Sequence, residues 1–188
     1  MSRSTMVQLI QHLRLMIGDS AAVPTPQFID DDLQIFLDRH REVIRYAIMK
    51  PEQTPAPFTG IAQYLDFYAD NQFWESDVTF YRMNFSAIIP DMIDCITGHI
   101  SFNISMIPPI FIVGKYYDMN GAAADALDAW ASAVALQTET HEGDAQYNLQ
   151  QKSQALLKMS EIYRKKAWSG VHSIIRNDTF VEGNPWGF

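Results

Sequence analysis

The sequence predicts an α+β fold, in which a small antiparallel helical bundle carries an inserted β module and ends in an extended C-terminal arm. Three observations predict it. Apolar residues recur at helical spacing at both ends of the chain, they alternate with polar residues in the middle, and no period persists after residue 168. We therefore expect residues 1–50 and 118–168 to form one helical domain, residues 51–117 the β insertion, and residues 169–188 the arm.

The first fifty residues predict two helices. One apolar face runs from Met6 to Ile17 and ends at Gly18, a residue that commonly terminates helices. The second helix is expected to begin within 28–32 and to run to about Met49, where a proline-rich stretch stops it. Its apolar stripe consists of Leu33, Phe36, Leu37, Ile44 and Ile48.

Asp30, Asp31 and Asp32 open the second helix and are expected to be structural. Consecutive helical residues point about 100° apart, so the three carboxylates cannot converge on one metal ion. Acids in a first turn instead stabilise the positive end of the helix dipole by about 0.3–1 kcal/mol each. Because Ile29 has no capping group, we expect Asp30 to be the N-cap.

Residues 58–117 have the period of β-strands. Alternation is clear in 61–68, 78–85 and 100–104, and Asp70–Asn71 predicts a turn after the first strand. The continuous apolar run Ile110–Val113 predicts a strand buried on both sides.

Residues 95–114 carry no charge and are numerous enough to cross a bilayer. Thr97, Gly98, His99, Asn103 and Pro108–Pro109 interrupt the span, so we interpret it as two buried strands around a turn. Polar residues also interrupt the first apolar segment, which argues against a signal peptide. We expect a soluble protein that is not secreted and does not contact a membrane.

Helical period returns over 120–137 and again over 146–168. The first of these helices has eight alanines between residues 122 and 135, which lets another helix approach closely, either in the same chain or in a neighbouring copy. We expect subunit packing through this face and the end of the last helix, at Ala126, Leu127, Trp130, Ala133, Val134 and Trp168. A basic patch follows on the last helix at Lys158, Arg164, Lys165 and Lys166.

The composition predicts a folded, acidic protein. The 188 residues are 47% apolar and carry a formal net charge of −8. Residues 151–188 hold six Lys/Arg against three Asp/Glu, while residues 1–150 hold eight against nineteen. An acidic body does not favour non-specific binding to nucleic acid. The single cysteine, Cys95, excludes an intrachain disulfide and a cysteine-based zinc site, and it suits a reducing compartment.

No catalytic pattern stands out. The histidines at 12, 40, 99, 141 and 172 lack metal-ligand spacing. His40 is interpreted as an interface or core histidine whose ring nitrogens have hydrogen-bond partners. We therefore predict no active site, no metal and no cofactor. Two alternatives stay open: a metal-dependent enzyme using Asp91 or Asp94 with His99, and a DNA-binding regulator using Arg164–Lys166.

Several sequence segments resemble the head–tail connector (adaptor, or head-completion) proteins of long-tailed bacteriophages. Residues 114–131 (GKYYDMNGAAADALDAWA) resemble the family's strand ending in Tyr-Asp, followed by an alanine-rich helix with a central Trp. Residues 28–38 (FIDDDLQIFLD), 97–102 (TGHISF) and 163–168 (YRKKAW) resemble the start of its early helix, its β insertion and its closing helix. The matches follow in order over about residues 5–168.

The resemblance implies a structural protein of the virion neck, assembled in the host cytoplasm. Copies would form a homo-oligomeric ring, expected to be dodecameric, between a portal protein above and a stopper or tail protein below. The ring would extend the DNA channel and complete the head after packaging, and an acidic wall would let the genome slide without sequence-specific binding.

The resemblance also implies that the C-terminal arm docks on the portal. Its large apolar residues suit pockets on a partner, and its glycines and Pro185 prevent a long helix. These docking residues are Ile174, Ile175, Phe180, Val181, Trp186 and Phe188. The alternative is that the arm folds back over its own β module.

Overall fold

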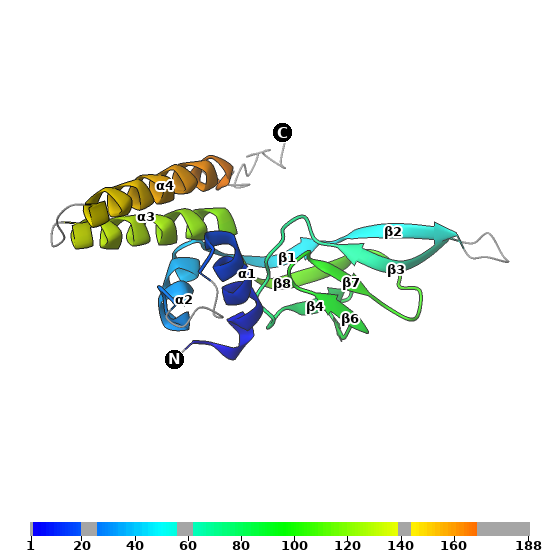
Figure 1. Cartoon of the computed structure of the whole chain (residues 1–188). Helices are drawn as coiled ribbons and strands as arrows, with labels where there is room; N and C mark the ends of the chain where they lie inside the picture. The colour runs from blue at the N-terminus through cyan, green and yellow to red at the C-terminus, as the bar shows by residue number, and fades with distance from the viewer. Residues whose placement is uncertain (1, 20–25, 56–61, 139–143, 169–188) are drawn as a thin grey trace, which may run out of the picture.

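The computed structural model describes residues 2–19, 26–55, 62–138 and 144–168, and it is a mixed α+β structure (Figure 1). The helical elements are η1 (Ser4–Met6), α1 (Val7–Ile17), α2 (Asp30–Arg39), α3 (Met119–Thr138) and α4 (Asp144–Lys166). The strands are β1 (Arg41–Ile48), β2 (Lys50–Pro55), β3 (Ala62–Tyr68), β4 (Thr79–Arg82), β5 (Ala87–Ile88), β6 (Met92–Asp94), β7 (His99–Ser101) and β8 (Ile110–Tyr117). The predicted α+β class is confirmed.

Helix α1 follows the sequence pattern closely. Leu9, Ile10, Leu13 and Ile17 are buried on one face. The helix ends at Gly18, whose φ of +73° lies in the left-handed region that glycine adopts without strain. The expected termination at this glycine is therefore confirmed.

Helix α2 is shorter than predicted, because residues 41–48 form strand β1 instead of continuing the helix to Met49. Ile44 and Ile48 are four residues apart, a spacing that fits one face of a helix and one face of a strand equally well. Antiparallel pairing with β8, from Arg41↔Tyr117 to Ile48↔Phe111, decides for the strand. The helical part of the N-terminal region thus ends near residue 40, not 50.

The expected cap of α2 is also wrong. Helix α2 begins at Asp30, and Ile29 is its N-cap without a side-chain hydrogen bond. Asp30 instead accepts hydrogen bonds from the buried Arg14 guanidinium at 2.8 and 3.2 Å, so the carboxylate is used in an ion pair between α1 and α2. Asp32 accepts a weak bond from the Ile29 amide at 3.4 Å.

The β module consists of two four-stranded antiparallel sheets, in the orders β1-β8-β4-β5 and β2-β3-β7-β6. Strand β8 extends beyond the apolar run that predicted it, and it is not buried on both sides as expected. Ile110 and Ile112 are buried whereas Phe111 and Val113 are only half-buried, the alternation of a strand with one core face. The second hydrophobic core lies between the sheets, around Trp74, Phe67 and Phe80.

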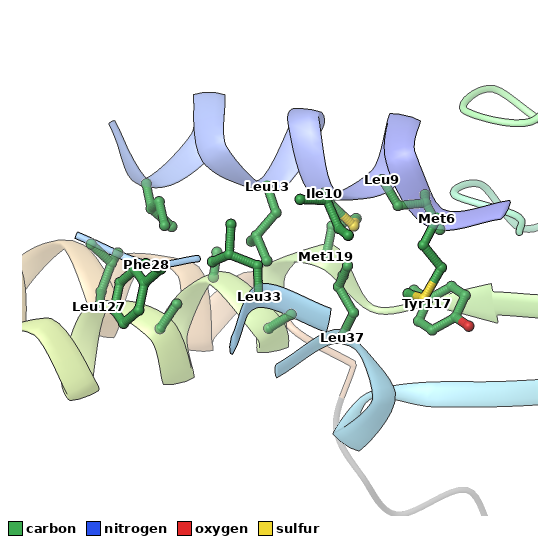
Figure 2. Close-up of a cluster of buried hydrophobic side chains, with 14 of the residues drawn as sticks. Met6, Leu9, Ile10, Leu13, Phe28, Leu33, Leu37, Tyr117, Met119 and Leu127 are labelled. Atoms are coloured by element: carbon green, nitrogen blue, oxygen red, sulfur yellow. The ribbon is translucent and has the colours of Figure 1, made fainter. Parts of the chain in front are cut away.

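The first hydrophobic core lies where α1, α2 and α3 meet (Figure 2). Leu156 of α4 also belongs to it. Gly121 on α3 allows one close approach here: a Cβ at this position would come within 2.5 Å of the His40 ring. His40 Nε2 lies 2.9 Å from Asp125 Oδ2, so this histidine joins the end of α2 to α3. Within the described residues, no helix is long and apolar enough to span a membrane.

Candidate functional site

Three of the residues expected at a subunit interface are buried inside their own chain. Ala126 and Leu127 are fully buried and Val134 almost so, all within the first core. Alanines on α3 do allow close helix contact, but the contact is with α1, α2 and α4 of the same chain. The expectation that these three side chains meet a neighbouring copy is therefore corrected. Ala133 is half-buried.

Both tryptophans named from the sequence pack within the chain. The Trp130 ring lies edge-on to Phe28 at a centroid distance of 6.3 Å, and Lys152 Nζ lies 5.2 Å from its centre. The Trp168 backbone amide donates to Asp118 Oδ2 at 2.7 Å, and its ring lies 4.8 Å from that of Tyr116. Trp168 thereby links the end of α4 to the β module.

The basic patch does not form one uniform surface. Arg164 Nη2 pairs with Asp128 Oδ2 at 2.5 Å and lies 3.6 Å from Asp125 Oδ1, so α3 neutralises it. Lys166 Nζ lies 6.0 Å from the centre of the Tyr163 ring. Lys158 and Lys165 are exposed on the outer side of α4.

The carboxylates of the enzyme alternative are turned toward backbone amides. Asp91 Oδ2 accepts from the Asn103 amide at 2.7 Å. Asp94 accepts from the Thr97 hydroxyl and from the amides of Ile96 and Thr97, bonds that lower its pKa. His99 pairs with Asp66, at 3.0 Å, rather than with either carboxylate. No group of three His, Cys, Asp or Glu side chains suited to a metal ion occurs among the described residues.

The structure reveals a partly exposed group of aromatic rings that the sequence did not predict, on the outer side of the first sheet. Tyr46, Tyr81, Phe85 and Phe111 form a chain of ring contacts, with centroid distances of 5.5 Å for Tyr46–Tyr81, 5.3 Å for Tyr46–Phe85 and 6.1 Å for Phe85–Phe111. Ile48 pairs with Phe111, which pairs in turn with Tyr81, so their side chains share this face. We call these five residues the outer aromatic face.

Two residues of the outer aromatic face adopt a backbone conformation that is rare for large side chains. Tyr46 and Phe85 both have φ of +58°. Tyr46 lies in the irregular register between Ile44 and Ala47, where β1 departs from regular pairing with β8. Left-handed backbone at a bulky residue costs about 1–3 kcal/mol and recurs at functional positions. The Tyr46 and Phe85 rings contact each other edge-to-face. Tyr46 is nevertheless 46% exposed and Phe85 61% exposed.

An ionic cluster around the buried Glu75 links the β module to the helices. Glu75 is 1% exposed and accepts hydrogen bonds from Thr5 Oγ1 at 2.5 Å, Tyr117 OH at 2.7 Å and Arg3 Nε at 3.1 Å. Arg3 also pairs with Asp38 of α2 at 2.6 Å. The cluster thus joins the N-terminal segment, α2 and β8.

Burial alone would raise the pKa of Glu75. The hydrogen bonds from Thr5 and Tyr117 and the charges of Arg3 and Lys115 outweigh burial, so the pKa lies below its ordinary value. The Glu75 carboxylate is therefore ionised in the folded protein at neutral pH. Burial and the hydrogen bond to Glu75 raise the pKa of the Tyr117 hydroxyl.

The six residues proposed for the docking arm, Ile174, Ile175, Phe180, Val181, Trp186 and Phe188, lie outside the described residues. Comparison with protein-family models, with curated proteins and with solved structures found no match to this chain.

Proposed function

We propose that this protein is a structural subunit of a virion neck, an adaptor that forms a ring between the portal and the tail and completes the head after packaging. The function rests on the resemblance of residues 28–38, 97–102, 114–131 and 163–168 to head–tail connector proteins. In this proposal α1–α4 act as a small antiparallel bundle, the β module projects from it, and the protein has no catalytic role.

The outer aromatic face is the observation in the structure that best supports an assembly role. Tyr46, Ile48 and Phe85 are each about half exposed or more, and Met83, two residues before Phe85 in the sequence, is more exposed still. Contiguous exposed apolar surface marks protein contacts in soluble proteins, and aromatic side chains dominate the energy of such contacts. Contact with neighbouring subunits would cover this face and remove its apolar surface from water.

The remaining parts of the proposal concern partners. Copies of the chain form a ring, expected to be dodecameric, with the portal protein above and a stopper or tail protein below. The C-terminal arm anchors the ring to the portal, and the genome passes through an acidic channel without sequence-specific contacts. Assembly takes place in the host cytoplasm, and the mature location is the neck.

Electron cryomicroscopy of particles assembled with this protein tests the proposal. We expect a closed ring of this chain between the portal and the tail, and deletion of residues 170–188 should leave DNA-filled heads that are not completed. A single copy in the neck, or a location outside it, contradicts the ring. Normal head completion by the truncated protein contradicts the arm as the portal anchor.

A further inference from the structure

Two stripes on opposite sides of the helical region carry the same pattern with opposite charge. On α4, Lys158, Ile162 and Lys165 are spaced i, i+4, i+7 and are all exposed. On α2, the same spacing is occupied by Asp31, Ile35 and Asp38. Residues at this spacing line one face of a helix, so each stripe is an isoleucine flanked by two like charges.

The isoleucine of each stripe points away from the chain's own core, whereas Asp31 and Asp38 beside Ile35 are half-buried. On α4 the buried side is marked by Leu156 and Ser160, and Lys158 lies about half a turn around the helix from them. On α2 the buried residues are Leu33 and Leu37, and Ile35 lies between them in sequence and opposite them in space. Ile162 is 54% exposed and Ile35 is 52% exposed, so neither isoleucine is covered within the chain.

Helix α3 lies between the two stripes. It packs against α4 on one side and against α1 and α2 on the other, as Figure 1 shows. One copy therefore presents a Lys–Ile–Lys stripe on one side and an Asp–Ile–Asp stripe on the other. A contact between unlike faces repeats from copy to copy and closes into a ring when the rotation per copy permits.

We propose that the α4 stripe of one copy docks on the α2 stripe of the next copy. In a parallel alignment the spacing places Lys158 near Asp31, Ile162 against Ile35 and Lys165 near Asp38. The wider charge distribution agrees: residues 149–166 carry five basic residues and one acidic residue, whereas α2 carries four acidic residues and one basic residue.

The cis partners of the acidic stripe do not prevent this docking. Asp38 already pairs with Arg3 of its own chain, but a carboxylate has about four lone-pair sites and accepts further donors. The isoleucine pair supplies apolar burial at the centre, and the charged pairs around it set which faces meet. The same charges oppose the like-on-like contacts α4–α4 and α2–α2.

This inference rests on the proposed ring and is tested by cysteine cross-linking of the full-length chain. Under oxidation, Ile35→Cys with Ile162→Cys should give a ladder of disulfide-linked copies on a non-reducing gel. Each single variant should stop at dimers. Cys95 is buried and stays in both variants. Leu15→Cys with Ile162→Cys is the matched control, because Leu15 is exposed on α1 outside either stripe, and it should give no ladder.

Charge reversal sharpens the test. Lys158→Glu should reduce the ladder of the Ile35/Ile162 pair, and adding Asp31→Lys should restore it, with thermal melts confirming that all variants fold. Salt near 1 M should weaken the ladder, because the screening length then falls to about 3 Å, comparable to the separation of a contacting charge pair.

The outcomes separate this inference from the proposed function. If closed rings form but the Ile35/Ile162 pair cross-links no better than the control, the stripe contact is wrong and the adaptor proposal is unaffected. Open ladders that never close into rings support the stripe contact and count against the ring. If neither a ladder nor a ring forms, both the stripe contact and the proposed ring are wrong.

Discussion

The helical region and the β module differ in how they bury and expose their apolar residues. In the helical region α3 is buried on most of its turns by α1, α2 and α4, and the exposed residues of α2 and α4 are a mixture of charged, polar and aliphatic side chains. In the β module adjacent residues alternate, so the buried Phe80 is followed by the half-exposed Tyr81. Among the described residues of the helices, no exposed cluster of aromatic rings matches the outer aromatic face.

This difference teaches that the two regions are suited to different contacts. Narrow, charged stripes select a partner by complementary charge and contribute modestly to affinity. A broad aromatic face buries more apolar area on contact and contributes more free energy. We expect the helical region to determine which copies meet and the β module to supply much of the strength of assembly.

The largest expected effect separates the two sides of the first sheet. Phe80→Ala removes a side chain that is 2% exposed, and it should lower the free energy of unfolding by about 3–5 kcal/mol. Tyr81→Ala, one residue along the same strand, is the matched control and should lower it far less. Chemical denaturation of both variants measures the difference. Equal losses would show that the outer aromatic face is part of the monomer's core.

The junction between the regions should be nearly as sensitive. Glu75→Gln removes a buried negative charge beside Arg3 and Lys115, and breaking a buried pair by removing one partner typically costs about 3–5 kcal/mol. Because Arg3 and Lys115 keep Asp38 and Asp77 as partners, the lower end of that range is expected. Asp77→Asn, at the exposed edge of the same cluster, should change the unfolding midpoint little. A Glu75→Gln protein as stable as the unmodified chain would contradict the coupling of the two regions through this carboxylate.

A smaller effect should distinguish two alanines of α3. Ala126 is fully buried, so Ala126→Leu overpacks the first core and should cost about 1–3 kcal/mol. Ala133 is half-buried, and Ala133→Leu should be tolerated better. Thermal melts of the two variants provide the comparison. If Ala126→Leu folds normally and instead impairs assembly, the assignment of this residue to the chain's own core is wrong.

The pH dependence is the smallest predicted effect. The pKa of Glu75 in the folded state lies below its ordinary value of 4.5, so its ionised form stabilises the fold fully above that value. This contribution is lost as the pH falls through the lowered pKa, where the folded protein takes up the proton. Denaturation midpoints between pH 7 and pH 3 should therefore fall on acidification, and they should fall less steeply in Glu75→Gln. If the denaturation midpoints of the two proteins fall equally with pH, Glu75 does not contribute to the acid sensitivity.

The sequence by itself determined those elements whose signal is local and long. Helix α1 with its terminating Gly18, the alanine-rich α3 and the long α4 follow from apolar spacing over many residues. Alternation located β3, β4 and β7, and a continuous apolar run located β8, although the ends of these strands were not predicted. Of the three aspartates that open α2, Asp30 pairs with Arg14 and Asp32 accepts a hydrogen bond from the Ile29 amide, so the sequence located the first turn of the helix but not the partners of these carboxylates.

Only the tertiary structure decided what depends on pairing between distant residues. Residues 41–48 become a strand because β8 is beside them, and no spacing within the segment distinguishes that strand from a helix. The burial of Ala126 and Leu127 depends on α4 folding back over α3, so an alanine face alone does not reveal which chain covers it. The outer aromatic face joins residues from β1, β4, β8 and the loop after β4, and the two stripes lie on opposite sides of α3. Such juxtapositions are set by chain topology, which local sequence does not encode.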